Sequence, residues 1–332
     1  MGLIKDLLYS VTTPTMLGKL NTRPIVGYYH LIDNKTPGHI KHRYSFKDID
    51  TFVADIKLLK KYYTPLDPKL LFQEGFKIPE NSFLITFDDG LRQIYQHAYP
   101  ILAENGLTAL NFLNPHYVDN KDLPQEYLCS VLIEHVHQST QGKISQIADF
   151  LETRATPDAV QQSINSCAYD KRGAMTKHIM DILGFNLEQY LHEEKPYMSL
   201  QELTEMKDTG FYFGGHTMSH PRMLQLSLEE QARESMDSID WVRQNLGLDY
   251  SAFAFPFTDK GMTTTLINKL FSYDDKLVIF GNSGIREDMH PRIVQRISLE
   301  KPERDTARHI AMENLYSTYL KLTGKYHIKR HG

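Results

Sequence analysis

The sequence predicts an α/β fold in which about seven parallel strands form a (β/α) barrel that is interrupted by a helical insertion. Short apolar runs typical of buried strands alternate along the chain with segments of helical periodicity. Most of these strands are followed by a helix, which is the order that a parallel sheet or barrel requires. With 332 residues, of which 41% are hydrophobic, the chain is large enough to bury such a core.

The expected strands are short apolar runs bounded by turn residues or polar segments. They cover residues 24–29, 82–87, 108–113, 211–215, 252–255, 277–280 and 293–298. Helices are expected where apolar residues recur at helical spacing, or where a capping box such as Ser199-x-x-Glu202 marks a beginning. They cover residues 45–61, 93–105, 199–209, 227–246, 263–271 and 304–322.

We expect residues 23–332 to form a single barrel domain after an N-terminal segment of residues 1–22. The helical insertion lies at about 115–196, where polar helical segments dominate and no strand-like run occurs. A lid, a partner surface and a spacer are all compatible with this pattern.

Residues 82–90, S-F-L-I-T-F-D-D-G, contain an apolar run that ends in two carboxylates and a glycine. A buried strand with this ending delivers acids to one end of a sheet or barrel. Asp88 and Asp89 are neighbours on an extended chain, so their side chains point to opposite sides and suit two different tasks. The alternative interpretation of D-D-G is a simple turn after a strand.

A second motif, G-G-H-T-M-S-H-P at residues 214–221, follows the apolar run at 211–213. His216 and His220 are four residues apart, so both lie within reach of one metal ion if the segment turns helical. Such a pair arises easily by chance among 15 histidines. The combination with the aspartate pair is far more specific.

Together these motifs resemble the first two motifs of the NodB-homology polysaccharide deacetylases, carbohydrate esterase family four. T-F-D-D-G at 86–90 and H-T-x-S-H at 216–220 carry the resemblance. G-Y-Y-H-L-I near Tyr28, A-Y-P-I-L-A-E-N-G from Ala98 and F-A-F-P-F from Phe253 extend it over residues 24 to about 300. The resemblance implies a distorted, seven-stranded version of the barrel.

The resemblance also implies roles for individual residues: Asp88 as general base, and Asp89, His216 and His220 as ligands of a metal ion. One carboxylate and two imidazoles leave a coordination position open for water, which is the pattern of a catalytic divalent metal, with Zn²⁺ the expected ion. Such an ion lowers the pKa of bound water and polarises a carbonyl oxygen. The family's third motif supplies a backbone N–H that donates to the oxyanion, and this N–H maps to Phe257.

The chain departs from the family pattern at two places. Ala254 stands where the family commonly has an arginine that orients the base. Four arginines are candidates to replace it, namely Arg222, Arg286, Arg292 and Arg296. The family's leucine-histidine motif, whose histidine is the general acid, has no clear match. His290 is our candidate for this acid, with an ordinary loop histidine as the alternative.

Two further residues are assigned to the substrate pocket. His30 ends the first strand and is expected to line the pocket, because catalytic groups of such barrels lie at the carboxyl ends of strands. Asp259 either lines the site as well or caps the helix that begins near residue 263.

The predicted function is a metal-dependent hydrolase that removes the N-acetyl group from an amino sugar of a polysaccharide or surface-glycan precursor. An O-acetyl esterase or cyclic-amide hydrolase with the same metal is one alternative. A catalytically decayed glycan-binding protein is another. Carbohydrate is therefore the expected partner, and a formal net charge of −4 gives no electrostatic case for nucleic acid. The sequence does not indicate an oligomeric state.

The chain shows no signal-peptide pattern and no apolar window of about 20 residues, so a cytoplasmic location is expected. Cys129 and Cys167 lack metal-site spacing and are expected to be reduced. Residues 3–11 fit a short amphipathic helix that either packs on the domain or contacts a membrane surface. The basic residues at 325–332 are expected to be solvated.

Overall fold

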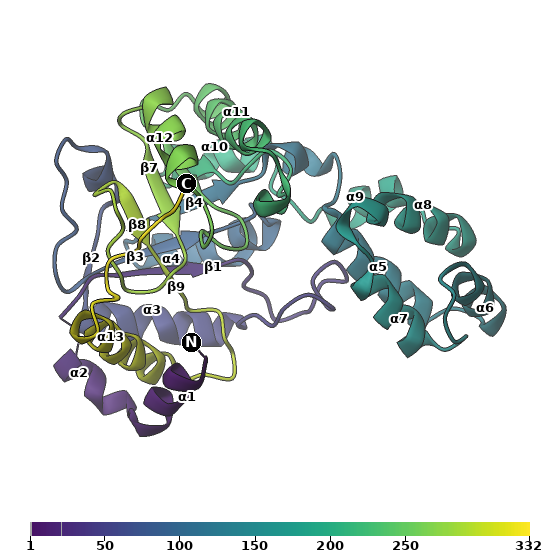
Figure 1. The fold of residues 1–332 in the computed structure, drawn as a ribbon, viewed down its shortest axis with the longest axis horizontal. Coiled ribbons are helices and arrows are strands. Elements are labelled where there is room, and N and C mark those ends of the chain that lie inside the picture. The colour runs from purple at the N-terminus through teal and green to yellow at the C-terminus, as the bar shows by residue number, and fades with distance from the viewer. Residues whose placement is uncertain (1, 21) are drawn as a thin grey trace. The chain divides into compact units, whose positions relative to one another are not determined.

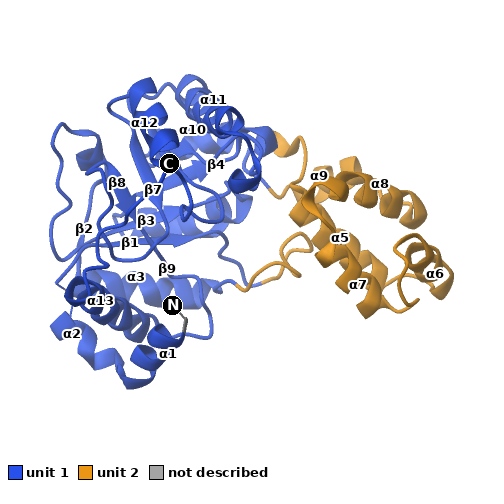
Figure 2. Ribbon diagram, viewed as in Figure 1, with its two compact units in different colours: residues 1–34, 46–118, 197–332 blue, residues 35–45, 119–196 orange. Residues whose placement is uncertain are grey.

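The computed structural model describes residues 2–20 and 22–332 of the chain (Figure 1). These residues form two compact units (Figure 2). Unit 1 contains the barrel and comprises the described residues up to 34 together with 46–118 and 197–332. Unit 2 is helical and comprises residues 35–45 and 119–196.

Eight strands of unit 1 follow one another in the order β8-β7-β6-β5-β4-β3-β1-β9, and every pairing is parallel. A two-residue strand, β2 (Thr64–Pro65), pairs with β3 outside this path. The strands on the path are β1 (Ile25–Tyr29), β3 (Ser82–Phe87), β4 (Ala109–Leu113), β5 (Tyr212–Gly215), β6 (Ala252–Ala254), β7 (Val278–Gly281), β8 (Ile293–Gln295) and β9 (Ile297–Ser298).

The barrel is nearly closed by a single segment that serves two strands. β8 pairs with β7, whereas β9 pairs with β1, and only Arg296 separates β8 from β9. The sequence predicted one strand at 293–298, and the interruption at Arg296 is the reason why eight parallel strands are present instead of about seven. The predicted distorted (β/α) barrel is confirmed.

Alternate residues of the strands face two different apolar clusters, as the pleat requires. Leu84 of β3 packs with Leu110 and Phe280 from other strands inside the barrel. Phe83 and Ile85 pack instead in the cluster shared with the surrounding helices. The inward series on β3 therefore runs from Leu84 through Thr86 to Asp88, so the strand itself directs Asp88 toward the barrel axis.

Helices surround the strands and follow the predicted alternation (Figure 1). The predicted helix at 93–105 begins as a π-helical turn, η3 (Ile94–Ala98), and continues as α4. The predicted capping box at Ser199 is present at the start of α10, and α11 begins with a capping box at Ser227. The α-helices of unit 1 are α1 (Gly2–Val11), α2 (Leu17–Leu20), α3 (Ile49–Tyr62), α4 (Tyr99–Glu104), α10 (Leu200–Asp208), α11 (Leu228–Leu246), α12 (Thr264–Tyr273) and α13 (Thr306–Leu322). Its 3₁₀ turns are η1 (Pro14–Met16), η2 (Pro68–Phe72) and η6 (Met223–Gln225), and a further turn, η4 (Pro115–Asn120), begins in unit 1 and ends in unit 2.

Unit 2 contains the helices that were expected in the insertion, and it also recruits a loop that sequence patterns did not reveal. Residues 35–45 belong to it: Ser130 Oγ donates to the carbonyl of Gly38, and His39 Nδ1 lies 2.9 Å from the Tyr190 hydroxyl. Inside the unit, Arg172 forms a buried ion pair with Glu126 (2.9 Å). Its helices are α5 (Gln125–His137), α6 (Gln141–Phe150), α7 (Pro157–Ser166), α8 (Arg172–Leu183) and α9 (Leu187–Glu194), with a 3₁₀ turn, η5 (Tyr169–Lys171).

The two ends of unit 1 pack on the barrel domain. α1 is held against α13 by an ion pair between Lys5 and Glu313 (2.6 Å), while Leu3 and Leu7 remain 88% and 65% exposed. The prediction of a solvated segment at 325–332 is wrong at Arg330, whose side chain is only 2% exposed and pairs with two carboxylates.

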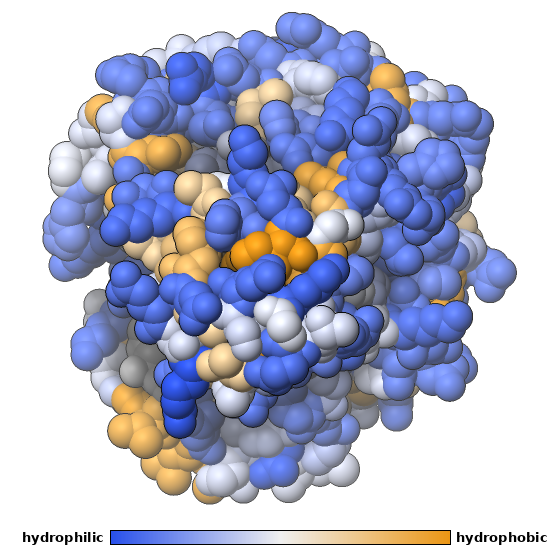
Figure 3. All heavy atoms as spheres, turned by 90° about the vertical axis from the view of Figure 1, so that its right-hand side faces the viewer, coloured by the Kyte–Doolittle hydropathy of each residue, from blue (hydrophilic) through white to orange (hydrophobic). Residues whose placement is uncertain are grey.

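Among the described residues, no helix combines the length and the apolar character needed to cross a membrane. Figure 3 shows one face of the molecule, on which hydrophobic residues form small patches between hydrophilic ones. Membrane contact through α1 stays a prediction.

Candidate metal centre and active site

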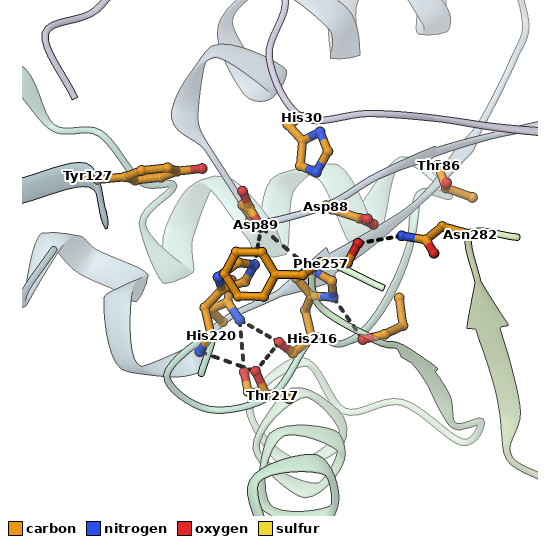
Figure 4. A network of polar contacts seen from close by, with 12 residues as sticks. His30, Thr86, Asp88, Asp89, Tyr127, His216, Thr217, His220, Phe257 and Asn282 are labelled. Atoms are coloured by element: carbon orange, nitrogen blue, oxygen red, sulfur yellow. Dashed lines mark hydrogen bonds and ion pairs between the residues drawn. The ribbon is translucent and has the colours of Figure 1, made fainter. Parts of the chain in front are cut away.

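The functional side chains lie at the carboxyl ends of neighbouring strands (Figure 4). Asp88 and Asp89 follow β3, and the backbone N–H of Asp88 donates to the carbonyl of Tyr29 (3.0 Å) at the end of β1. Asp89 has a φ of 71°, in the left-handed region that residues other than glycine rarely adopt. This backbone turn sends the two adjacent carboxylates to different partners.

Asp89, His216 and His220 converge on one point, as predicted. Their nearest ligand atoms all lie within 4.8 Å of one another. Nε2 of His216 and Nε2 of His220 lie 3.5 and 3.3 Å from the same oxygen, Asp89 Oδ1. His216 follows β5, so its proximity to Asp89 follows from the packing of the strand ends.

The two histidines meet through a loop, not through the helical turn that their spacing suggested. Thr217 and His220 have φ values of 68° and 53°. Asn114, after β4, donates through Nδ2 to the carbonyls of His216 (2.6 Å) and Thr217 (3.0 Å). Glu234 of α11 accepts from the backbone N–H and the hydroxyl of Ser219, both at 3.0 Å. The loop conformation is thus fixed from both sides.

The protonation pattern of His216 fits a metal ligand. Its Nδ1 lies 2.8 Å from the carbonyl oxygen of Ala254, which only accepts, so Nδ1 carries the proton. Nε2 is the ring nitrogen that faces Asp89. Burial opposes ionisation of Asp89, but the imidazoles of His220, His216 and His30 hold the pKa of its carboxyl far below the usual range. One anionic oxygen facing two imidazole nitrogens suits a divalent cation.

Asp88 is held by Arg296 in a buried, bidentate ion pair. The two guanidinium nitrogens lie 2.7 and 2.9 Å from the two carboxylate oxygens. The same guanidinium donates to Thr86 Oγ1 (3.0 Å) and to the carbonyl of Gly281 (3.1 Å). Burial raises the pKa of Asp88, but the charge and hydrogen bonds of Arg296, together with His216 and His30, outweigh burial, and the net effect lowers the pKa. The carboxylate is therefore ionised and fixed in orientation.

Arg296 is thus the arginine that replaces the one missing at Ala254. The other three candidates have different partners in the structure. Arg222 lies over the ring of Phe257, Arg286 donates to the carbonyls of residues 325 and 326, and Arg292 donates to the carbonyl of residue 276.

His30, at the end of β1, points toward the carboxylates (Figure 4). Its Nδ1 lies 2.7 Å from Glu300 Oε2, while its backbone N–H donates to Glu300 Oε1 (2.9 Å). Burial disfavours the charged ring, but Glu300, with Asp89 and Asp88 behind it, raises the pKa of His30 to about 10. His30 is therefore an imidazolium at neutral pH. Glu300 was not identified from the sequence, because it lies 270 residues from His30 and carries no motif.

Phe257 lies on the loop after β6, with its ring 4.5 Å from that of His220. Its φ is 57°, and Asn282 Nδ2 donates to its carbonyl oxygen (2.8 Å). Phe257 is 45% exposed and contacts the ligand residue His220, whereas its role toward the oxyanion stays a prediction. Asn282 was not identified from the sequence.

The structure does not bring His290 and Asp259 to the reacting groups. His290 precedes β8, so it lies at the amino ends of the parallel strands, opposite to Asp88; its ring packs on Phe271 at 4.0 Å. Asp259 follows β6 but is 1% exposed, and its carboxylate accepts a hydrogen bond from the guanidinium of Arg330. Asp259 does not cap α12 either, since Thr263 does. Both assignments are corrected for these reasons.

Family comparison agrees with this geometry. The family model described as polysaccharide deacetylase matches residues 77–149 and 172–298, which include both aspartates and both ligand histidines.

The chain belongs to the polysaccharide deacetylase family.

A curated relative is YxkH of Bacillus subtilis (strain 168), named as a polysaccharide deacetylase on a putative basis. It is 31% identical over 100 residues, which are 30% of this chain and 34% of that protein. The match thus spans about a third of the relative's length.

Solved structures share the fold of this polysaccharide deacetylase family member. The Streptococcus pyogenes deacetylase PplD, in complex with acetate, has a TM-score of 0.53 and 18% identity, over 90% of this chain and 98% of its own. IcaB from Ammonifex degensii has a TM-score of 0.52 and 16% identity, over 88% of this chain and 97% of its own. Both likenesses cover most of this chain and show that the fold is shared.

Proposed function

We propose that this chain is a divalent-metal-dependent N-deacetylase acting on an N-acetylated amino sugar of a polysaccharide or surface-glycan precursor. The observation that carries the proposal is the placement of an ionised, arginine-held Asp88 directly beside the Asp89–His216–His220 group. Support also comes from a structure of similar fold, a deacetylase solved with acetate, which is the acid released by deacetylation.

Asp89, His216 and His220 would hold the ion, and Zn²⁺ is our proposed ion because a carboxylate with two imidazoles is a zinc-type set. When bound, such an ion supplies an acidified water and polarises the acetamide carbonyl.

Asp88 acts as the general base in this proposal. Its carboxylate must take the proton of the attacking water, and a base must be ionised and oriented for that step. Arg296 supplies both conditions through two hydrogen bonds. In this proposal the backbone N–H of Phe257 donates to the developing oxyanion, a role in which one donor contributes about 10²–10³ to kcat.

His30, not His290, is our proposed general acid. Breaking the amide bond expels an amine, which needs a proton, and His30 carries one because Glu300 faces it. The ring points into the same space as Asp88 and Asp89 (Figure 4). His290 lies at the other end of the strands and cannot reach that space.

The test measures acetate release from matched N-acetylated and O-acetylated amino-sugar oligomers, with metal-stripped and metal-loaded protein. We expect release from the N-acetyl substrate, loss on stripping, and recovery with Zn²⁺. Asp88→Asn should abolish turnover while the metal still binds. Asp208→Asn, on a side chain that is 62% exposed, is the matched control.

Turnover by fully stripped protein would contradict the proposal. Faster release from the O-acetyl substrate would identify an esterase in its place. Glycan binding without hydrolysis under any divalent metal would identify a binding protein.

A further inference from the structure

Arg330 lies far from the metal-ligand group in sequence, yet its side chain enters a buried polar cluster behind the active-site loop. The guanidinium donates to Asp259 Oδ2 (2.7 Å), to the Asp259 carbonyl (2.8 Å), and to both oxygens of Asp288 (2.6 and 3.0 Å). Gln295 Nε2 donates to the same two carboxylates, at 2.8 Å each. We call Asp259, Asp288, Gln295 and Arg330 the Arg330 cluster.

Charge explains why the cluster depends on Arg330. The side chains of Asp259 and Asp288 are 1% and 0% exposed. Two carboxylates that close together and so poorly hydrated repel each other strongly unless a cation lies between them. Arg330 is the cation in that place, and Gln295 adds only a neutral amide.

The cluster is connected by hydrogen bonds to the loop that carries Phe257. Asp259 Oδ1 accepts from the backbone N–H of Asn282 (3.2 Å) and from the Ser283 hydroxyl (2.8 Å). Asn282 Nδ2 in turn donates to the carbonyl of Phe257 (2.8 Å). Phe257 has a left-handed φ of 57°, which an aromatic residue keeps only where its surroundings fix it.

The cluster also touches the segment that holds the base. Gln295 directly precedes Arg296, and its side-chain oxygen accepts from the backbone N–H of Ser283 (2.7 Å). Arg296 donates through its backbone N–H to the carbonyl of Gly281 (3.2 Å). The segment 281–283 therefore joins the Arg330 cluster both to the Phe257 loop and to Arg296.

We propose that Arg330 is a positioning residue for the reaction: it holds Asp259 and Asp288 together, and through Asn282 it keeps the Phe257 backbone N–H directed at the site. This inference rests on the proposed deacetylase function. It assigns a role to a segment that the family model does not cover, since the match ends at residue 298. Arg330 touches no metal ligand, so its loss should affect turnover and leave metal binding intact.

The experiment compares Arg330→Ala with Arg330→Lys and with Lys329→Ala, an exposed neighbouring cation, in the full chain. For Arg330→Ala we expect kcat to fall at least about tenfold, part of the loss known for a missing oxyanion donor. KM and the Zn²⁺ dissociation constant should stay within about twofold of the wild-type values, because Arg330 acts on turnover and not on binding. Arg330→Lys should recover part of kcat, because it restores the charge without the bidentate geometry. Lys329→Ala should match wild type.

A double-mutant cycle with Asn282→Ala tests whether Arg330 acts on Phe257 through Asn282. If both residues act through Phe257, the loss in kcat of Asn282→Ala/Arg330→Ala should be clearly smaller than the product of the two single losses. Hydrogen exchange gives a readout that needs no activity: peptides covering residues 256–260 should exchange faster in Arg330→Ala, and peptides of β3 and β5 should not.

Three results for Arg330→Ala would each overturn the proposal. They are unchanged hydrogen exchange at 256–260, a loss in kcat of the double variant equal to the product of the two single losses, and a kcat equal to that of wild type. An equal loss of zinc affinity and thermal stability in Arg330→Ala and Arg330→Lys would also overturn it, because it would mean a structural role only. Absence of acetate release by wild-type protein would instead refute the deacetylase function, and the exchange data would still decide whether Arg330 positions the loop.

Discussion

Replacing Arg296 by methionine is the most informative perturbation of the base. The side chain of Arg296 is 1% exposed and that of Asp88 is 5% exposed, so the variant leaves a buried carboxylate without its cation. Removing one partner of a buried ion pair costs about 3–5 kcal/mol of unfolding free energy. Methionine is apolar and of similar length, so the loss of packing adds little.

The sign of the pH dependence follows from the pKa of Asp88. Arg296 holds this pKa below its ordinary value, so the pair stabilises the fold above the unfolded-state pKa of about 3.9 and loses that effect as pH falls below it. In Arg296→Met burial is opposed only by the weaker effects of His216 and His30, so the pKa of Asp88 rises. The stability gap between wild type and variant should therefore narrow at low pH, and the acidic limb of the kcat–pH profile should move to higher pH.

Urea denaturation at pH 7 and at lower pH measures the stability gap between wild type and variant. Acetate release as a function of pH measures the shift of the acidic limb. Asp88→Asn/Arg296→Met is the control: it removes the charge that Arg296 leaves behind and should be more stable than Arg296→Met. A destabilisation below about 1 kcal/mol, typical of an exposed pair, with an unmoved acidic limb would refute the reasoning.

Three further perturbations test other parts of the structure. Asp89→Asn should weaken Zn²⁺ binding at least about 100-fold in calorimetry, because the only anionic ligand becomes neutral. Glu300→Gln should move the basic limb of the kcat–pH profile down by about 1–3 units, because the carboxylate that raises the pKa of His30 is lost. Gly215→Ala should cost about 1–3 kcal/mol in denaturant titrations, since a Cβ there would lie 2.9 Å from the Ile239 backbone nitrogen, whereas Gly142→Ala meets open space and should not destabilise.

Local sequence patterns predicted the strands and the ligand group because each depends on a few adjacent residues. The apolar run at 82–87 ends at Asp88 wherever the rest of the chain lies, and its burial follows from composition alone. The ligand roles of Asp89, His216 and His220 came from the family resemblance of two short motifs. The positions of Asp89 and His216 after strands agree with these roles, because parallel strands bring their carboxyl ends together.

The partners of these residues depend on long-range packing that no local pattern contains. Arg296 contacts Asp88 although the two residues are 208 positions apart. The sequence could not rank Arg296 above the three other candidate arginines, because the contact depends on how the barrel closes. Arg330 looked like part of a solvated basic segment, because the two carboxylates that bury it lie 71 and 42 positions away. His290 was proposed because no other histidine matched the family motif, although the strand predicted at 293–298 already placed His290 before a strand instead of after one.

The different tasks of Asp88 and Asp89 arise from one backbone feature. Asp88 continues the inward series of β3, so it meets Arg296 where β8 and β9 separate. An uninterrupted strand at 293–298 would keep the alternation regular, and the break lets Arg296 pair with Asp88 while its backbone bonds to Gly281. The left-handed turn at Asp89 then directs the second carboxylate toward His216 and His220. Exchanging the two tasks would require reversing that turn, so neither aspartate can substitute for the other.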